Sequence, residues 1–98
     1  MRMKFLDFDL GHLSGGETVT VTLSGVESDV MVMSATDVSD FAAGRRITYW
    51  GGHYRQSPAK IGVPSAGAWH AVVIPGRGGR VEARVSVSHP RRFSAAGI

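Results

Sequence analysis

The sequence contains no cysteine. A disulfide framework, a thiolate metal site and a thiol nucleophile are therefore excluded, and a reducing compartment is favoured. No apolar run approaches the length that spans a membrane. The N-terminal stretch MRMKFLDFDL is interrupted by Asp7 and Asp9, unlike the unbroken apolar core of a signal peptide. We expect a cytoplasmic protein that does not enter a membrane.

Acidic residues are scarce in the second half of the chain. Residues 1–44 carry two basic and seven acidic residues, whereas residues 45–98 carry nine basic residues and one acidic residue, Glu82. Three interpretations remain open: opposite charges meet across neighbouring strands, a basic surface attracts an anionic partner, or copies of the domain associate acidic face to basic face.

The length of 98 residues is that of one domain with a single hydrophobic core and no deep interdomain cleft. We expect this domain to span residues 1–89. The stretch RRFSAAGI after Pro90 loses all periodicity, so we expect residues 90–98 to form a flexible C-terminal tail.

Apolar residues alternate with polar ones in most of the chain, which is typical of antiparallel strands with one wet face. The strand candidates ETVTVTLSG and RVEARVSVSH place one shared set of residues in the core: Val19, Val21, Leu23, Val81, Val85 and Val87. GAWHAVVIP is apolar enough to be a central strand. DVMVM is apolar on both sides, so it is either covered on both faces or presents Met31 and Met33 to a partner.

Glycine-rich turns separate these runs, and only SATDVSDFAAG breaks the alternation. We therefore predict an all-β fold: a small antiparallel β-sandwich, jelly-roll-like, of about seven strands with one short helical segment near residues 36–43.

The segments LGHL, GGETVTVTLSG, GRRITYWGGHYRQSP and GVPSAGAWHAVV resemble a small bacterial family described as domain of unknown function 1883. The resemblance covers residues 3–88. It implies an all-β cytoplasmic domain of about this length, found alone or joined to Toll/interleukin-receptor-like domains, and it implies no activity. The segment DVMVMSATDVSDFAAG departs from the Asn-rich, Tyr-bearing form that is usual in the family.

The catalytic and metal chemistries find little support. The four histidines, His12, His53, His70 and His89, lie in separate segments without ligand spacing. GHLSGG does not match the spacing of a nucleophile elbow. We expect no enzymatic activity, no metal and no cofactor, and we single out His53 and His70 as the one histidine pair with a chance to converge at one end of the sandwich.

Aromatic residues make up only 8% of the chain, yet three of them flank a pair of glycines in YWGGHYR. In the strand candidate RITYW, Tyr49 and Trp50 fall on opposite faces, so at least one ring points away from the main core. Exposed rings beside arginines suit stacking and pairing with an anion. The predicted binding residues are Arg45, Arg46, Tyr49, Trp50, His53, Tyr54, Arg55 and His70. The competing interpretation is that Trp50 and Tyr54 cap the end of the sandwich while Gly51 and Gly52 turn the chain.

Function is predicted only as a class. The first hypothesis is a non-catalytic binding or adaptor module whose partner is a protein, including another copy of itself. The alternative is a binder of a small anionic or aromatic ligand, a nucleotide, sugar or nucleic acid, on the Tyr49–Arg55 surface. Nucleic acid is the weaker candidate because the expected lysine cluster is missing.

Overall fold

The computed structural model describes residues 5–76 and 79–89. Within them lie seven strands and one helix: β1 (Leu6–Leu13), β2 (Thr18–Gly25), β3 (Ser28–Ser34), α1 (Ala35–Ala42), β4 (Trp50–Tyr54), β5 (Ala59–Gly62), β6 (Gly67–Pro75) and β7 (Val81–Ser88). The predicted tail, residues 90–98, lies outside the described residues, so its flexibility stays a prediction.

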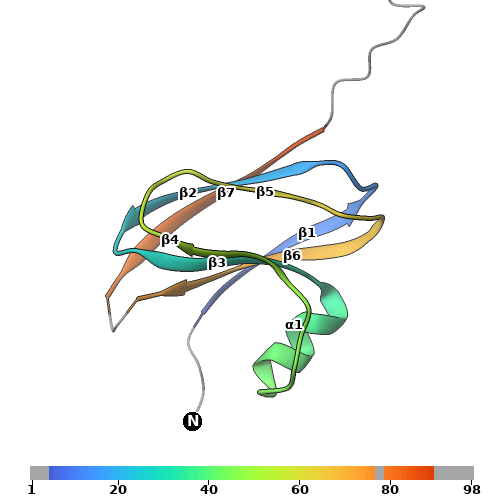
Figure 1. The fold of residues 1–98 in the computed structure, drawn as a ribbon, viewed down its shortest axis with the longest axis horizontal. Helices are drawn as coiled ribbons and strands as arrows, with labels where there is room; N and C mark the ends of the chain where they lie inside the picture. Colours follow the sequence, from blue (N-terminus) through green and yellow to red (C-terminus); the bar gives the residue numbers. More distant parts are fainter. Residues whose placement is uncertain (1–4, 77–78, 90–98) are drawn as a thin grey trace, which may run out of the picture.

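The strands form two antiparallel sheets, one with the order β1-β6-β3-β4 and one with the order β5-β2-β7. The chain changes sheet at every connection except the one from β3 through α1 to β4. Figure 1 shows the two layers and places α1 outside the larger sheet. The prediction of a small antiparallel β-sandwich with one helical segment is confirmed.

The core lies between the sheets and follows the period-two pattern of the sequence. Val19 and Val21 of β2 are fully buried against residues of β3 and β6. Leu23 and the inward side chains of β7 pack against the same core but stay partly accessible. The predicted core set is thus confirmed, and the core is less complete at β7 than at β2.

The helix α1 explains why β3 is apolar on both faces. Val30 and Val32 face the core between the sheets, whereas Met31 and Met33 face outward. Val38 and Phe41 of α1 pack against this outer methionine cluster. Both faces of β3 are therefore covered at least in part.

Two caps define the ends of α1. The Ser34 side chain accepts a hydrogen bond from the Asp37 backbone N–H at 3.3 Å, which satisfies one free donor of the first turn. Beyond the helix, Gly44 adopts a φ of +76° and the Arg45 backbone N–H donates to the Asp40 carbonyl oxygen at 2.8 Å. Glycine suits this reversal because the left-handed conformation costs it little.

The expected strand RITYW with a turn at Gly51 and Gly52 is wrong. Residues 45–49 form no strand, and β4 runs straight through both glycines. Gly51 has a φ of +124°, and a Cβ there would collide with the Val30 carbonyl oxygen of the neighbouring strand. Glycine at this position permits a close approach inside the sheet instead of a turn.

No helix among the described residues is long and apolar enough to cross a membrane.

Candidate ligand-binding site

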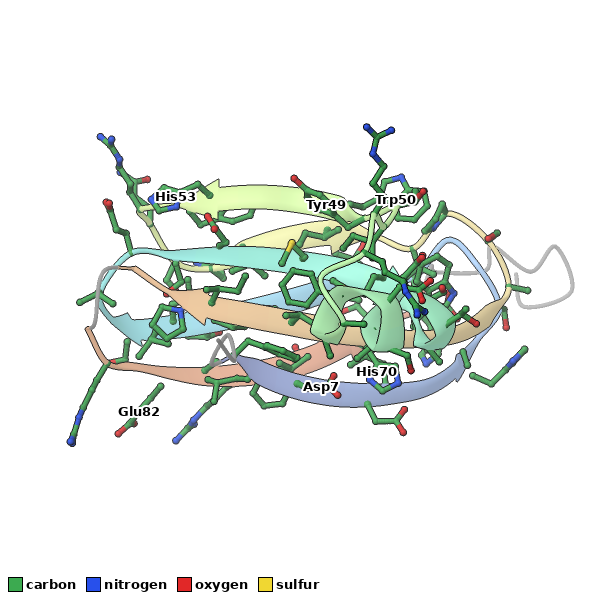
Figure 2. The ribbon with its side chains drawn as sticks, turned by 90° about the horizontal axis from the view of Figure 1, so that it is seen from below. Asp7, Tyr49, Trp50, His53, His70 and Glu82 are labelled. Atoms are coloured by element: carbon green, nitrogen blue, oxygen red, sulfur yellow. The ribbon has the colours of Figure 1, made fainter. Side chains whose placement is uncertain are left out.

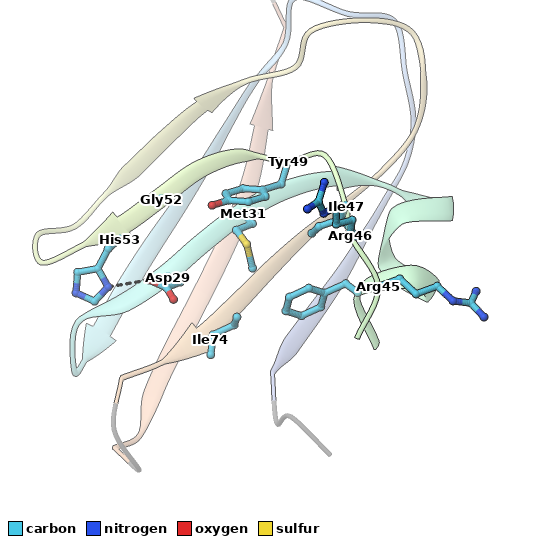
Figure 3. Close-up of a pocket in the computed structure, with 10 residues that line it drawn as sticks. Asp29, Met31, Arg45, Arg46, Ile47, Tyr49, Gly52, His53 and Ile74 are labelled. Atoms are coloured by element: carbon cyan, nitrogen blue, oxygen red, sulfur yellow. Dashed lines mark hydrogen bonds and ion pairs between the residues drawn. The ribbon is translucent and has the colours of Figure 1, made fainter. Parts of the chain in front are cut away.

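A hollow of about 600 Å³ lies on the outer face of the larger sheet, beside α1 (Figure 3). Three strands, the helix and the segment between α1 and β4 contribute to it. Its lining residues are Asp29, Met31, Phe41, Arg45, Arg46, Ile47, Tyr49, Gly52, His53 and Ile74.

The floor of the hollow is apolar. Met31 and Ile74 point outward from β3 and β6, and both belong to or pack against the outer methionine cluster. Phe41 closes one side from α1 and is held edge-on by Phe5, with ring centroids 5.2 Å apart. An apolar floor that stays open to solvent offers contact area to a ligand with an apolar body.

The segment after α1 forms a basic and aromatic rim. The Arg45 guanidinium lies 3.4 Å from the Asp40 carboxylate, and its side chain is 73% exposed. Arg46 is exposed and has no ion pair with any residue in the described ranges. Tyr49 is 48% exposed, and Figure 3 shows its ring beside Met31. The rim thus offers the Arg46 guanidinium, which forms no ion pair with the described residues, and the accessible ring of Tyr49.

A histidine held by two carboxylates lies at the far end of the hollow. His53 of β4 is the cross-strand partner of Asp29 on β3. Its Nδ1 lies 2.7 Å from an Asp29 carboxylate oxygen, and its Nε2 lies 3.2 Å from a Glu27 carboxylate oxygen. Hydrogen bonds to Asp29 first and Glu27 second raise the pKa of His53 above its usual value of about 6.5.

Arg55 extends the same cluster, because its Nε lies 3.5 Å from the Glu27 carboxylate. His53 and Arg55 come from the basic half of the chain, and Glu27 and Asp29 come from the acidic half. In this cluster, basic side chains from the second half of the chain therefore contact acidic side chains from the first half.

Four of the eight predicted binding residues line the hollow: Arg45, Arg46, Tyr49 and His53. Arg55 lies next to His53 and Tyr54 along a smaller depression. Trp50, Tyr54 and His70 do not line the hollow, so the predicted set does not form one patch. Figure 2 shows Tyr49 and Trp50 near one another and His53 at the other end of the same strand.

Trp50 and Tyr54 belong to the sandwich and not to the hollow. Trp50 is 38% exposed and packs edge-on against buried Trp69, with ring centroids 5.6 Å apart. The Trp69 indole N–H donates to the Ser65 carbonyl oxygen at 2.9 Å. Tyr54 is partly buried against the core. Both rings therefore contact the sandwich core, but they are the first and last residues of β4 and so do not cap the same end.

His70 is separate from His53. It lies on β6, and its Nδ1 is 2.8 Å from an Asp7 carboxylate oxygen on β1. Both histidines lie on the outer face of the larger sheet, paired with Asp29 and Met33 of β3. Figure 2 shows them far apart on this face, so the expected chance of convergence is not realised. Within residues 5–76 and 79–89, no three His, Cys, Asp or Glu side chains are grouped so that they could hold a metal ion.

The sequence reasoning missed Phe41, Ile47, Ile74 and Asp29 as site residues. Only the doubly apolar DVMVM stretch signalled the outer face, by showing that Met31 requires cover or a partner. The helix α1 covers only part of this outer face, and the hollow lies where the cover ends.

The fold and the hollow define the chain as a seven-stranded β-sandwich domain with an open, helix-bordered depression on one sheet. A model of the family described as "Domain of unknown function (DUF1883)" matches residues 3–92. The chain belongs to this family, as its sequence segments indicated. No curated protein and no solved structure matches the chain.

Proposed function

We propose that the domain is a non-catalytic binding module whose outer-face hollow takes a small ligand with a flat apolar body and a negative charge. The observation that carries the proposal is the exposed guanidinium of Arg46 at the rim of an apolar floor, with no ion-pair partner in the part of the chain that the structure describes. A planar guanidinium pairs with a carboxylate, sulfonate or phosphate in two parallel hydrogen bonds. The floor supplies the apolar contact.

The ring of Tyr49 supports a flat ligand body. It is accessible and lies next to Met31, so an aromatic ligand gains both stacking and thioether contact. The hollow is open, and the affinity expected of such a site is modest because much of the ligand stays in water.

His53 supports binding over catalysis. Both of its ring nitrogens lie within hydrogen-bond reach of carboxylates, so neither is free to take a proton from a substrate. The histidine instead holds Asp29 at the end of the hollow, and when it is protonated it offsets the negative charge that would repel an anionic ligand.

The test uses 1-anilinonaphthalene-8-sulfonate, an aromatic sulfonate whose fluorescence rises on apolar contact. Its neutral counterpart, N-phenyl-1-naphthylamine, has the same rings without the sulfonate. We expect Arg46→Gln to weaken binding of the sulfonate roughly tenfold, the loss of one charged hydrogen-bonding partner, and to leave binding of the amine unchanged. Arg80→Gln is the matched control, because Arg80 is exposed and lines neither this hollow nor the other depressions described.

Amide chemical shifts locate the probe. Shifts confined to residues around Met31, Phe41, Arg46 and Ile74 support the proposal. Shifts that concentrate elsewhere, or equal affinity for the sulfonate and the amine in the wild-type protein, contradict it. Gly52→Leu gives a second check, because Gly52 lines the hollow and an added Cβ there meets no atom within 4 Å; we expect the larger side chain to weaken binding of both probes.

A protein partner is the second candidate, and the partly covered apolar face favours it. The self-association form of this candidate rested on the charge difference between the two halves of the chain. Pairs within the chain, Arg45 with Asp40 and Arg55 with Glu27, take up part of that difference. Their presence weakens the electrostatic argument for association between copies.

A further inference from the structure

The two sides of the sandwich are closed to different degrees. On one side β4 packs directly on β5, since a Cβ on Gly51 would lie 3.0 Å from the Ile61 Cδ1 atom. On the other side lie the edges of β1 and β7, which form no ladder with one another within the described residues. Figure 2 shows β1, with Asp7, and the start of β7, with Glu82, on the side opposite to His53.

The chain connections show that, among the described residues, no strand of the smaller sheet lies opposite β1. Three short links cross between the sheets: β2 to β3, β4 to β5 and β6 to β7. We therefore place β2 opposite β3, β5 opposite β4 and β7 opposite β6. β1 is the fourth strand of the larger sheet and extends beyond the smaller one. Its inward side chains are accordingly accessible: Leu6 is 37% exposed, and Phe8 and Leu10 are partly exposed.

A hollow of about 670 Å³ marks this incomplete side. Leu6 and Phe8 line it from β1, and Glu82, Ala83 and Arg84 line it from β7, with Thr22 and Ser24 of β2 behind them. Ala83 is the smallest inward residue of β7, where its neighbours along the strand are valines. The hollow therefore has space opposite Ala83 for a large apolar side chain.

One edge of β7 pairs with no other strand in residues 5–76 and 79–89, so its backbone groups there are open to a partner. The Val26 backbone N–H donates to the Arg80 carbonyl oxygen at 3.1 Å, so this pair is a hydrogen-bonded one. Hydrogen-bonded pairs alternate along an antiparallel ladder, which assigns Glu82, Arg84, Ser86 and Ser88 to the bonds with β2. The backbone N–H and C=O groups of Val81, Ala83, Val85 and Val87 consequently point away from β2, toward the open side.

β7 is less protected than the other edge strands, because its two charged residues, Glu82 and Arg84, have opposite signs and can pair with charges on an added strand. β1 carries Asp7 and Asp9 and has an irregular register near Gly11, which discourage pairing along its edge. β4 and β5 are short, at five and four residues. β7 is eight residues long, holds no proline or glycine and pairs in an unbroken register with β2.

We propose that β7 accepts an extended segment of a partner protein as a fourth strand of the smaller sheet, antiparallel to β7 and opposite β1. Backbone groups at Ala83 and Val85 bind the segment, and Leu6 and Phe8 contact its inward side chains. The outward residues Glu82 and Arg84 set the charges: the segment carries an acidic residue opposite Arg84, a large apolar one opposite Ala83 and a basic one opposite Glu82.

Position in the fold favours a single added strand over a second copy of the domain. If the β7 strands of two copies paired, the β6 strand of the partner copy would fall where β1 already lies. The inference is independent of the ligand proposed for the outer-face hollow, because the two sites share no lining residue.

The test is fluorescence anisotropy of a labelled heptapeptide, Thr-Val-Glu-Phe-Lys-Val-Thr, with the full chain. The matched control peptide exchanges Glu and Lys and has the same composition. We expect the first peptide to bind roughly tenfold more tightly, since two cross-strand pairs change from attraction to repulsion in the control. The double variant Glu82→Arg, Arg84→Glu should prefer the control peptide instead.

Ala83→Pro tests the backbone contact. The proline removes the Ala83 backbone N–H, which points away from β2 toward the open edge of the sheet. The hydrogen bonds between β7 and β2 stay in place, as proline on an edge strand allows. We expect a folded protein by circular dichroism that no longer binds either peptide; should this variant unfold, the reciprocal charge exchange decides alone. Equal binding of both peptides, or a wild-type dimer that Ala83→Pro converts to a monomer, would overturn the proposal.

Discussion

The two faces of the four-stranded sheet differ in burial and in residue type, although their side chains alternate along the same strands. Facing the core, Val30, Val32 and Val73 are fully buried and surrounded by apolar side chains. On the opposite face, the same strands present methionines beneath α1 and histidine–carboxylate pairs at the flanks. A step of one residue along β3 or β6 thus moves a side chain from a dry core to a partly open surface. We expect changes on the inner face to alter stability and changes on the outer face to alter binding.

The largest effect is expected for Trp69→Ala. Trp69 is 4% exposed and its indole N–H is hydrogen-bonded, so truncation should lower the free energy of unfolding by about 3–5 kcal/mol. Tyr49→Ala, at a position that is 48% exposed on the other face, should change it by less than about 0.5 kcal/mol. Urea unfolding followed by circular dichroism measures both. Similar losses in the two variants would show that the faces do not differ in this way.

The pair of glycines in β4 gives a matched comparison within one strand. Gly51→Val should cost at least about 2 kcal/mol, because a valine there is strained and collides with the Val30 carbonyl oxygen. Gly52→Val should cost less than about 0.5 kcal/mol, since a Cβ at Gly52 meets no atom within 4 Å. Thermal unfolding of the two single variants tests the difference, and equal midpoints would contradict it.

The sequence was sufficient to predict the sandwich because its strands alternate cleanly, as in Val19 and Val21. It was misleading at Gly51 and Gly52, where a glycine pair is typical of a turn. Gly51 is required because atoms of β3 and β5 both come close to it. This approach depends on how the strands pair and pack, and no local sequence pattern contains that information.

The outer-face hollow could be predicted only in part. Arg46, Tyr49 and His53 were identified from local composition. Phe41 and Ile74 reach the hollow from α1 and β6, and the contact of His53 with Asp29 joins residues 24 positions apart. Such a site depends on the register between strands, and that register is fixed by packing of the whole core.

Trp50→Ala distinguishes the two roles considered for the aromatic stretch. The ring is partly exposed and packs edge-on against Trp69, so its loss should cost about 1–2 kcal/mol, an intermediate value. Because Trp50 does not line the outer-face hollow, affinity for the anilinonaphthalene sulfonate should stay within about twofold of the wild type. Loss of probe binding in a variant that remains folded would instead place Trp50 in the recognition surface.

The smallest effect on stability is expected from the charge of His53. The hydrogen bonds to Asp29 and Glu27 raise its pKa in the folded protein, so His53 binds its proton more tightly when folded than when unfolded. Its stabilising contribution is therefore complete below about pH 6.5, where the unfolded chain is protonated too, provided that the carboxylates stay ionised above about pH 4.5. This contribution is lost as the pH rises through the pKa of the folded state.

Two measurements check this pH dependence. The difference in melting temperature between the wild type and His53→Gln should be larger near pH 5.5 than near pH 9, values on either side of the usual histidine range of roughly 6 to 7. In a nuclear magnetic resonance titration, Asp29→Asn should lower the titration midpoint of His53, because the larger of the two hydrogen-bonding causes is removed. An unchanged midpoint in Asp29→Asn would show that the hydrogen bond to Asp29 is not what raises the pKa of His53.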